Sequence, residues 1–243
     1  MRIVLSLLLL ALAAYVAVCA LVFFRQRSMI YYPQAFEGGT VLALGGGAHV
    51  GVTLHEQSGP SAVIYFGGNA EAVGYSLAEL QAVFPGQSLY LMHYRGYGAT
   101  SGEPTEAGLF ADALALYDHV RALHPQVTLV GRSLGSGIAT RLASVKPVDR
   151  LVLVTPYDSM AGAASHHFPW LPVRLLLRDR YDSASYAAKV NAPTTILAAE
   201  RDEVIPRASS EVLYRSFRPG LATFHVIPGV GHNDISLRQM PPG

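Results

Sequence analysis

Ser133 lies at the centre of a G-x-S-x-G pattern formed by residues 131–135. The apolar run Val127–Val130 precedes the pattern, and a helical run over Leu134–Val145 follows it. A serine on a sharp turn between a strand and a helix has its hydroxyl free of the sheet, and the flanking glycines leave room for neighbouring strands. We therefore predict that Ser133 is a nucleophile on such a turn. The alternative is a glycine-rich turn whose serine caps the helix, since a chain with 23 glycines can contain the five-residue pattern by chance.

A base must accompany this serine, because a hydroxyl is a weak nucleophile near neutral pH. An imidazole held by a carboxylate meets the need. Among nine histidines, His232 is the predicted base, because it stands in a glycine-rich loop after the last predicted strand. His93 falls in a predicted strand and is expected to pack in the sheet. His166 and His167 fall in an insertion, where substrate contact and simple solvation both remain open.

Asp202 is the predicted acid. It follows the apolar run Thr194–Ala198 and precedes His232 along the chain, which gives the order Ser, Asp, His of a doubly wound hydrolase. The three groups would then emerge together at the carboxyl edge of the sheet. Glu203 and Asp158 remain rival candidates for the same role.

A Gly-Gly-Asn turn at residues 67–69 directly follows the apolar run Ala62–Phe66. Acyl transfer requires N–H donors for the developing oxyanion, each typically contributing about 2.7–4 kcal/mol. We predict that the backbone N–H groups of Asn69 and of Leu134, the residue after the serine, are these donors. A turn that caps the next helix would be compatible with this role.

The elements that must position these residues alternate along the chain after about Ser28, which predicts an α/β fold with a mostly parallel eight-stranded sheet flanked by helices. The predicted strands cover Val41–Leu44, Val50–His55, Ala62–Phe66, Ser88–His93, Val127–Val130, Leu151–Val154, Thr194–Ala198 and Ala222–Val226. The predicted helices include Ala70–Val83, Glu106–Leu123, Leu134–Val145 and Ala208–Phe217. The first two strands, joined across three glycines, are expected to form an antiparallel hairpin.

The segment of residues 155–193 interrupts this alternation and is predicted to be a lid within a hydrolase domain of residues 28–243. Its apolar side chains are candidates for lining an acyl groove. They are Phe168, Trp170, Leu171, Leu175, Leu176 and Leu177.

Residues 3–24 contain no charged side chain, and as a helix they would be about 33 Å long, close to the thickness of a bilayer's hydrocarbon core. We predict that residues 1–27 are an uncleaved, single-pass membrane anchor. A cleaved signal peptide would have a shorter apolar run, and a lipoprotein would have a small residue where Val18 precedes Cys19. A buried helix of a soluble core is the other alternative. Arginines flank both ends of the run, so no membrane side is predicted.

The composition narrows the possible partners. A net charge of +1, from 18 basic and 17 acidic side chains, leaves no basic surplus for phosphates, so a nucleic-acid partner is not expected. Only 14% of residues are charged and 51% are hydrophobic, which is in keeping with a membrane segment. A single cysteine forms no intramolecular disulfide, and no cysteine–histidine cluster suggests zinc. No oligomeric state is indicated.

Taken together, residues 66–70, 94–98 and 131–135 with Asp202 and His232 resemble the alpha/beta-hydrolase superfamily, over about residues 28–232. The anchor followed by residues 26–33 is similar to a single-pass membrane branch related to serine-aminopeptidase-type hydrolases and acyl-protein thioesterases. The resemblance implies a Ser133–Asp202–His232 triad that acts through an acyl-enzyme without metal or cofactor. In one departure, Gly67 stands where this family usually has a histidine, which leaves the backbone donor in place.

The predicted function is hydrolysis of carboxylic ester or thioester bonds in acyl or lipid-like substrates close to a membrane. Two alternatives remain open. A peptidase that releases N-terminal residues would need an acidic group to receive the substrate's ammonium. A noncatalytic interaction module would keep the fold and bind a partner through the lid.

Overall fold

The computed structural model describes residues 1–98 and 100–241, which include one eight-stranded sheet in the order β1-β2-β4-β3-β5-β6-β7-β8. Strand β2 runs antiparallel to β1 and β4, and the other neighbours are parallel. The strands are β1 (Thr40–Ala43), β2 (His49–His55), β3 (Ser61–Phe66), β4 (Ser88–His93), β5 (Gln126–Arg132), β6 (Arg150–Val154), β7 (Thr194–Ala199) and β8 (Ala222–Ile227). The predicted α/β class and the antiparallel hairpin, which turns through a 3-10 helix η1 (Gly45–Gly47), are confirmed.

Helices cover both faces of the sheet because the strands bury side chains alternately on each. In β3, Ile64 packs in a core with side chains of α3 (Glu106–Leu123), α4 (Leu134–Ala143) and α8 (Arg207–Ser216). Its neighbour Val63 packs in a second core with α2 (Leu77–Val83) and the 3-10 helix η3 (Leu237–Gln239). The side chains predicted to react, at the carboxyl ends of the strands, therefore stand on a sheet that is buried on both sides.

One predicted helix, Ala70–Val83, begins later than expected. A 3-10 turn η2 (Val73–Ser76) comes first, and α2 starts at Leu77. The Glu71 carboxylate accepts the Gly68 N–H at 2.7 Å, which holds residues 68–71 in a turn instead of a helix.

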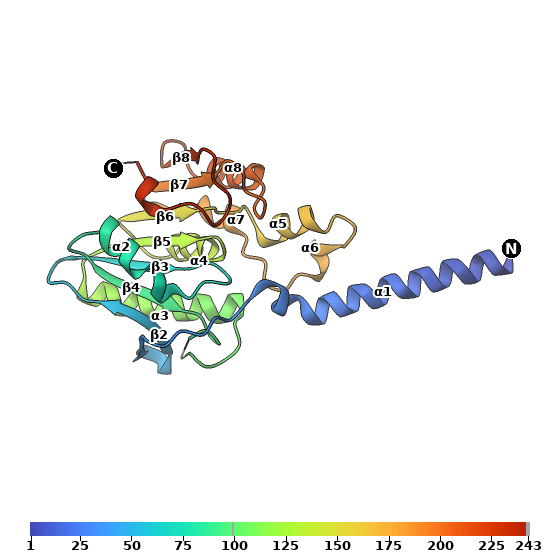
Figure 1. Cartoon of the computed structure of the whole chain (residues 1–243), viewed down its shortest axis with the longest axis horizontal. Coiled ribbons are helices and arrows are strands. Elements are labelled where there is room, and N and C mark those ends of the chain that lie inside the picture. Colours follow the sequence, from blue (N-terminus) through green and yellow to red (C-terminus); the bar gives the residue numbers. More distant parts are fainter. Residues whose placement is uncertain (99, 242–243) are drawn as a thin grey trace.

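The N-terminal helix α1 (Arg2–Ile30) extends away from the body of the molecule (Figure 1). It has 29 residues and contains an apolar stretch long enough to cross a membrane. Residues 155–193, which we call the lid segment, contain the short helices α5 (Met160–His167), α6 (Val173–Leu176) and α7 (Ser183–Ala187). Helices α5 and α6 project beyond the sheet on the side from which α1 leaves (Figure 1).

Candidate active site

Ser133 occupies a strained turn between β5 and α4, with φ 48° and ψ −116°. A positive φ is unfavourable for a residue with a β-carbon, so the surrounding structure must impose it. The Ser133 N–H donates to the Val154 carbonyl at 2.8 Å, and the Ser136 hydroxyl donates to the Ser133 carbonyl at 2.6 Å. A β-carbon at Gly135 would lie 2.1 Å from the Phe66 carbonyl oxygen, so only glycine allows α4 to approach β3 this closely.

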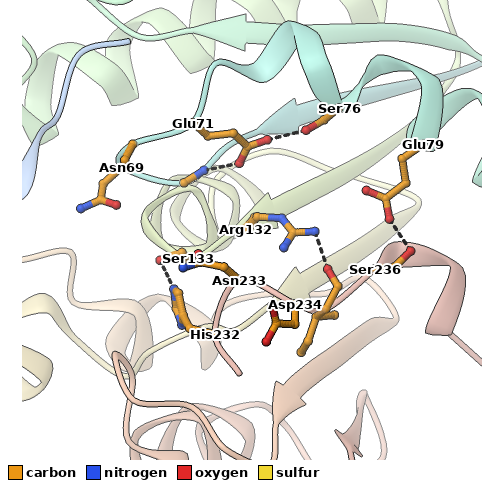
Figure 2. Close-up of a pocket in the computed structure, with 13 residues that line it drawn as sticks. Asn69, Glu71, Ser76, Glu79, Arg132, Ser133, His232, Asn233, Asp234 and Ser236 are labelled. Carbon is orange, nitrogen blue, oxygen red and sulfur yellow. Dashed lines mark hydrogen bonds between the residues drawn. The ribbon is translucent and has the colours of Figure 1, made fainter. Parts of the chain in front are cut away.

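His232 and Asp202 complete a chain of hydrogen bonds to this serine. His232 Nε2 lies 2.9 Å from Ser133 Oγ, and His232 Nδ1 lies 2.9 Å from each carboxylate oxygen of Asp202 (Figure 2 draws the first bond). Both side chains are buried, at 6% and 4% exposure, so little water competes for these hydrogen bonds. Asp202 Oδ1 also accepts the N–H groups of Val204 and Ile205, at 3.0 and 2.7 Å. These two backbone bonds hold the carboxylate in the position from which it orients the imidazole.

The two rival carboxylates have other partners. Glu203 Oε2 accepts the backbone N–H of His232 at 3.4 Å and does not bond the ring. Asp158 accepts hydrogen bonds from the hydroxyls of Ser159 and Ser209. Of the three carboxylates, the structure brings Asp202 to the imidazole.

The turn at residues 67–69 lies beside the serine. A β-carbon at Gly68 would be 3.9 Å from Ser133 Cβ, and Asn69 borders the same cavity as Ser133. Throughout the described part of the chain, no group accepts a hydrogen bond from the backbone N–H of Asn69 or of Leu134. The Gly68 N–H is instead taken by Glu71. The structure therefore leaves the two predicted oxyanion donors unbonded.

The surroundings of Gly67 explain why glycine stands where the resemblance leads one to expect a histidine. A β-carbon there would lie 2.5 Å from Val73 Cγ1 and 3.0 Å from the Glu71 carboxylate. The Gly67 carbonyl accepts both the Tyr94 hydroxyl and the Gly135 N–H. The turn is therefore held by its backbone, and Val73 and Glu71 occupy the space of a side chain.

A cavity of about 460 Å³, which we call the polar cavity, opens on one side of Ser133 (Figure 2). Four charged groups line it: Glu71, Glu79, Arg132 and Asp234. Each of the four side chains forms a hydrogen bond with a neighbouring group. Glu71 and Glu79 accept hydrogen bonds from the hydroxyls of Ser76 and Ser236. Arg132 donates to the Ile235 carbonyl, and Asp234 accepts a hydrogen bond from the Gly231 N–H. Sequence analysis missed these residues, because they come from separate segments and no local motif joins them.

Arg132 is the one cation among these four groups. Burial disfavours its charge, but Tyr65, Glu71 and Glu79 outweigh that effect and raise the pKa of Arg132 above its ordinary value. Burial and the nearby Glu71 raise the pKa of Tyr65, so its hydroxyl stays protonated and donates to Glu71 at 2.7 Å. The cavity thus carries three carboxylates against one guanidinium.

A second cavity of about 330 Å³, which we call the apolar groove, lies between α1 and the lid segment. Side chains of α5 and α6 line it together with one face of α1 and with Ile205 from the Asp202 loop. The predicted lining residues Phe168, Leu171, Leu176 and Leu177 are among them. Trp170 and Leu175 are not, and the prediction was wrong for them: they point outward, 56% and 82% exposed.

His93 packs within the sheet, as predicted: it is buried in β4, and its Nε2 lies 2.8 Å from the Thr53 hydroxyl. Burial lowers the pKa of His93. His167 borders the apolar groove, with Nε2 2.7 Å from the Val204 carbonyl oxygen. Within residues 1–98 and 100–241, no group of three or more His, Cys, Asp or Glu side chains is arranged to hold a metal ion.

Comparison with known proteins gives three kinds of match. A family model described as the alpha/beta hydrolase fold matches residues 61–185. An uncharacterized protein of Mycobacterium tuberculosis is 36% identical over 93% of this chain and 88% of its own length. The lysophosphatidylserine lipase ABHD12 of Danio rerio is 29% identical over 65% of this chain and 47% of its own. An esterase of Pyrococcus furiosus has a similar structure, with a TM-score of 0.64 and 16% identity over 84% of this chain and 90% of that one.

Proposed function

The chain belongs to the alpha/beta-hydrolase family, and we propose that it is a membrane-anchored serine hydrolase that cleaves carboxylic ester or thioester bonds in acyl, lipid-like substrates. The observation that carries the proposal is the hydrogen-bond chain from Ser133 through His232 to Asp202. Relatives and neighbours named as lipase or esterase support the substrate class.

In the proposed reaction, Ser133 Oγ attacks the acyl carbon while His232 Nε2 takes the hydroxyl proton. Asp202 holds the ring so that Nδ1 keeps its proton and Nε2 is free to accept one. The Asn69 and Leu134 N–H groups stabilise the negative charge on the former carbonyl oxygen. The imidazolium then protonates the leaving oxygen or sulfur, and an ester remains on Ser133. His232 then takes a proton from a water molecule, whose oxygen attacks that ester. The bond between the acyl carbon and Ser133 Oγ breaks, His232 returns the proton to Oγ, and the acid leaves.

The anchor proposal rests on the length and apolar character of α1 and on its contacts. From Tyr15 to Tyr31 the helix and the residue after it donate hydrogen bonds to the lid segment, including Tyr15 to Trp170 and Gln26 to Leu176. If α1 were a cleaved signal peptide, its removal would also remove one wall of the apolar groove. These contacts therefore favour an anchor that stays attached.

A second candidate, an aminopeptidase-type peptidase, is favoured by one observation: the carboxylates of Glu71, Glu79 and Asp234 in the polar cavity could receive a substrate ammonium. Turnover of acyl esters against aminoacyl amides by the same preparation separates the two. A noncatalytic interaction module would have no use for the bonded Ser133 and His232, and absence of any Ser133-dependent hydrolysis would point to it.

A fluorophosphonate probe tests the proposal directly, because it labels a serine only when an adjacent base activates it. We expect labelling of the wild-type chain and none of Ser133→Ala. Ser144→Ala, at the other end of α4, is the matched control and should label like the wild type. Equal labelling of wild type and Ser133→Ala would overturn the assignment.

A further inference from the structure

We propose that the acyl chain of the substrate lies in the apolar groove, so that the anchor helix α1 is itself one wall of the acyl-binding site and the chain enters from the bilayer. The inference rests on the proposed ester or thioester hydrolysis at Ser133 and adds to it where the acyl part binds and what shapes that site.

The groove begins beside the reacting atoms. Asn69 borders both the apolar groove and the polar cavity that contains Ser133. Ile205, whose N–H binds Asp202, also lines the groove. An acyl carbon within reach of Ser133 Oγ therefore has the start of the groove next to it.

Four residues of α1 form the wall: Val22, Gln26, Met29 and Ile30. Their spacing of four, three and one places them on one face of the helix. The polar side chains of the two helical walls have partners: Gln26 bonds the Phe23 and Leu176 carbonyls and the Arg178 N–H, and His167 bonds the Val204 carbonyl. No charged side chain of the described residues lines it. An alkyl chain between these walls would thus replace water without taking a hydrogen-bond partner from Gln26 or His167.

Polar contacts of Arg27 and Tyr31, those of Tyr31 buried, fix α1 in this position. Arg27 pairs with Asp179 at 3.2 Å, and the Tyr31 hydroxyl donates to Asp179 at 3.1 Å and lies 2.8 Å from the Tyr181 hydroxyl. Burial raises the pKa of Tyr31, which keeps its proton for these bonds. A flexible tether would need none of these contacts, so they indicate that the helix has a defined place in the site.

The same end of the helix also holds the proposed oxyanion turn. Asn69 Nδ2 donates to the Ile30 carbonyl at 2.9 Å, and the Tyr32 N–H donates to the Asn69 carbonyl at 3.0 Å. Figure 2 shows the Asn69 side chain directed away from Ser133. Because its side chain is bound to the last turn of α1, its backbone N–H is positioned by the anchor.

The hydrogen bond of Tyr15 shows how far the lid segment extends along α1. The Tyr15 hydroxyl donates to the Trp170 carbonyl at 2.9 Å, about 22 Å along the axis from Ile30. If α1 spans the membrane, the tip of the lid segment lies at the depth of acyl chains, and the exposed Trp170 and Leu175 contact lipid. The groove between α1 and the lid segment then opens to the bilayer from which the chain comes.

The test fills the groove from either wall in the full-length protein in detergent micelles. Ala164→Phe acts from α5 and Val22→Phe from α1. The matched controls, Ala161→Phe and Leu21→Phe, lie on the same helices and do not line the groove. Hydrolysis of p-nitrophenyl acetate and p-nitrophenyl laurate is compared, with fluorophosphonate labelling of Ser133 as the measure of an intact site.

We expect kcat/KM for laurate to fall about tenfold or more in both groove variants, because several methylenes lose their contacts, while acetate turnover stays within about twofold. The controls should leave both unchanged. Equal turnover of laurate by groove variants and wild type, or equal losses for acetate and laurate with labelling retained, would overturn the inference. A wild-type protein that hydrolyses neither ester would instead overturn the proposed function.

A second measurement does not depend on folding of a variant. A long-chain fluorophosphonate with a diazirine at the end of its alkyl chain is attached to Ser133 and irradiated. We expect cross-links to residues 22–30 and 160–177. Cross-links confined to the peptide that carries Glu71 and Glu79, in the polar cavity, would contradict the proposed position of the chain.

Discussion

The polar cavity and the apolar groove meet at Asn69 and differ in almost every other respect. The polar cavity is walled by the carboxyl edge of the sheet, by α2 and by loops, and its charged side chains are each fixed by hydrogen bonds. The apolar groove is lined mostly by two elements that lie outside the sheet, α1 and the lid segment. The sheet and its loops thus form one half of the site, and the lid segment with an attached helix forms most of the other.

This division suits the proposed acyl substrate, which has two unlike ends. An acyl chain gains from the apolar groove through the hydrophobic effect, and a polar leaving group keeps its hydrogen bonds in the polar cavity. Only the reacting carbonyl needs the groups that the two regions share. Substitutions should therefore fall into those that affect every substrate and those that affect one end of it.

The largest effect is expected at the shared centre. Asp202→Asn removes the charge that holds the His232 ring, and kcat should fall about 10⁴-fold for acetate and laurate esters alike. Steady-state kinetics with both esters measure the loss. Glu203→Gln, a neighbouring carboxylate that bonds only the backbone of His232, is the control and should keep most of the activity. A loss confined to one ester would contradict a common role for Asp202.

A second substitution acts on the polar side. Arg132→Met removes donors to the Ile235 carbonyl and the Tyr65 hydroxyl, at 2.8 and 3.3 Å, and leaves the nearby Glu71 without its cation. We expect a loss of about 1.5–3 kcal/mol in the free energy of unfolding, because hydrogen bonds to a charged group are removed at a half-buried position. Urea unfolding measures it. Since Ile235 is three residues after His232, turnover should fall for short and long esters together.

A third substitution loosens the apolar side. Gln26→Ala leaves the Leu176 carbonyl and the Arg178 N–H without their partner, a cost of about 1–3 kcal/mol. The loss is local to the contact between α1 and the lid segment, so we expect faster proteolysis after Arg174 or Arg178 and weaker laurate turnover, with acetate turnover retained. Gln34→Ala, which removes only an exposed hydrogen bond to the Tyr32 carbonyl, is the control. Unchanged proteolysis would show that Gln26 does not fasten the lid segment.

The contrast between the two regions also explains what could be predicted from the sequence. The eight strands are confirmed within two residues because buried strands read as short apolar runs between glycines and prolines. Helix α3 has the predicted bounds, with Thr105 accepting the Gly108 N–H at its start. Ser133, His232 and Asp202 could be selected because each stands directly after a strand or its adjoining turn.

The apolar groove could not be predicted in this way. Gln26 and Leu176 are 150 positions apart, and neither belongs to a local motif that would pair them. Trp170 and Leu175 were expected to line the groove because they are apolar, but hydrophobicity alone does not tell a groove-facing side chain from one that faces outward. The four charged groups of the polar cavity could not be predicted from the sequence either, because packing between distant segments brings them together.

The smallest expected effect tests the charge of the polar cavity without disturbing its shape. Glu79 Oε1 accepts the Ser236 hydroxyl and the Leu237 N–H, and the carbonyl oxygen of a glutamine can accept both. Glu79→Gln should therefore keep the fold and remove one of three negative charges. We expect KM to fall about two- to fivefold for an ester with an anionic leaving group and to rise by a similar factor for a cationic one, both changes shrinking in high salt. Ser236→Ala, which removes a hydrogen bond and no charge, is the control. If KM changed in the same direction and by the same factor for anionic and cationic esters, the leaving group would not enter the polar cavity. The proposed roles of Ser133 and of the apolar groove would be unaffected by that result.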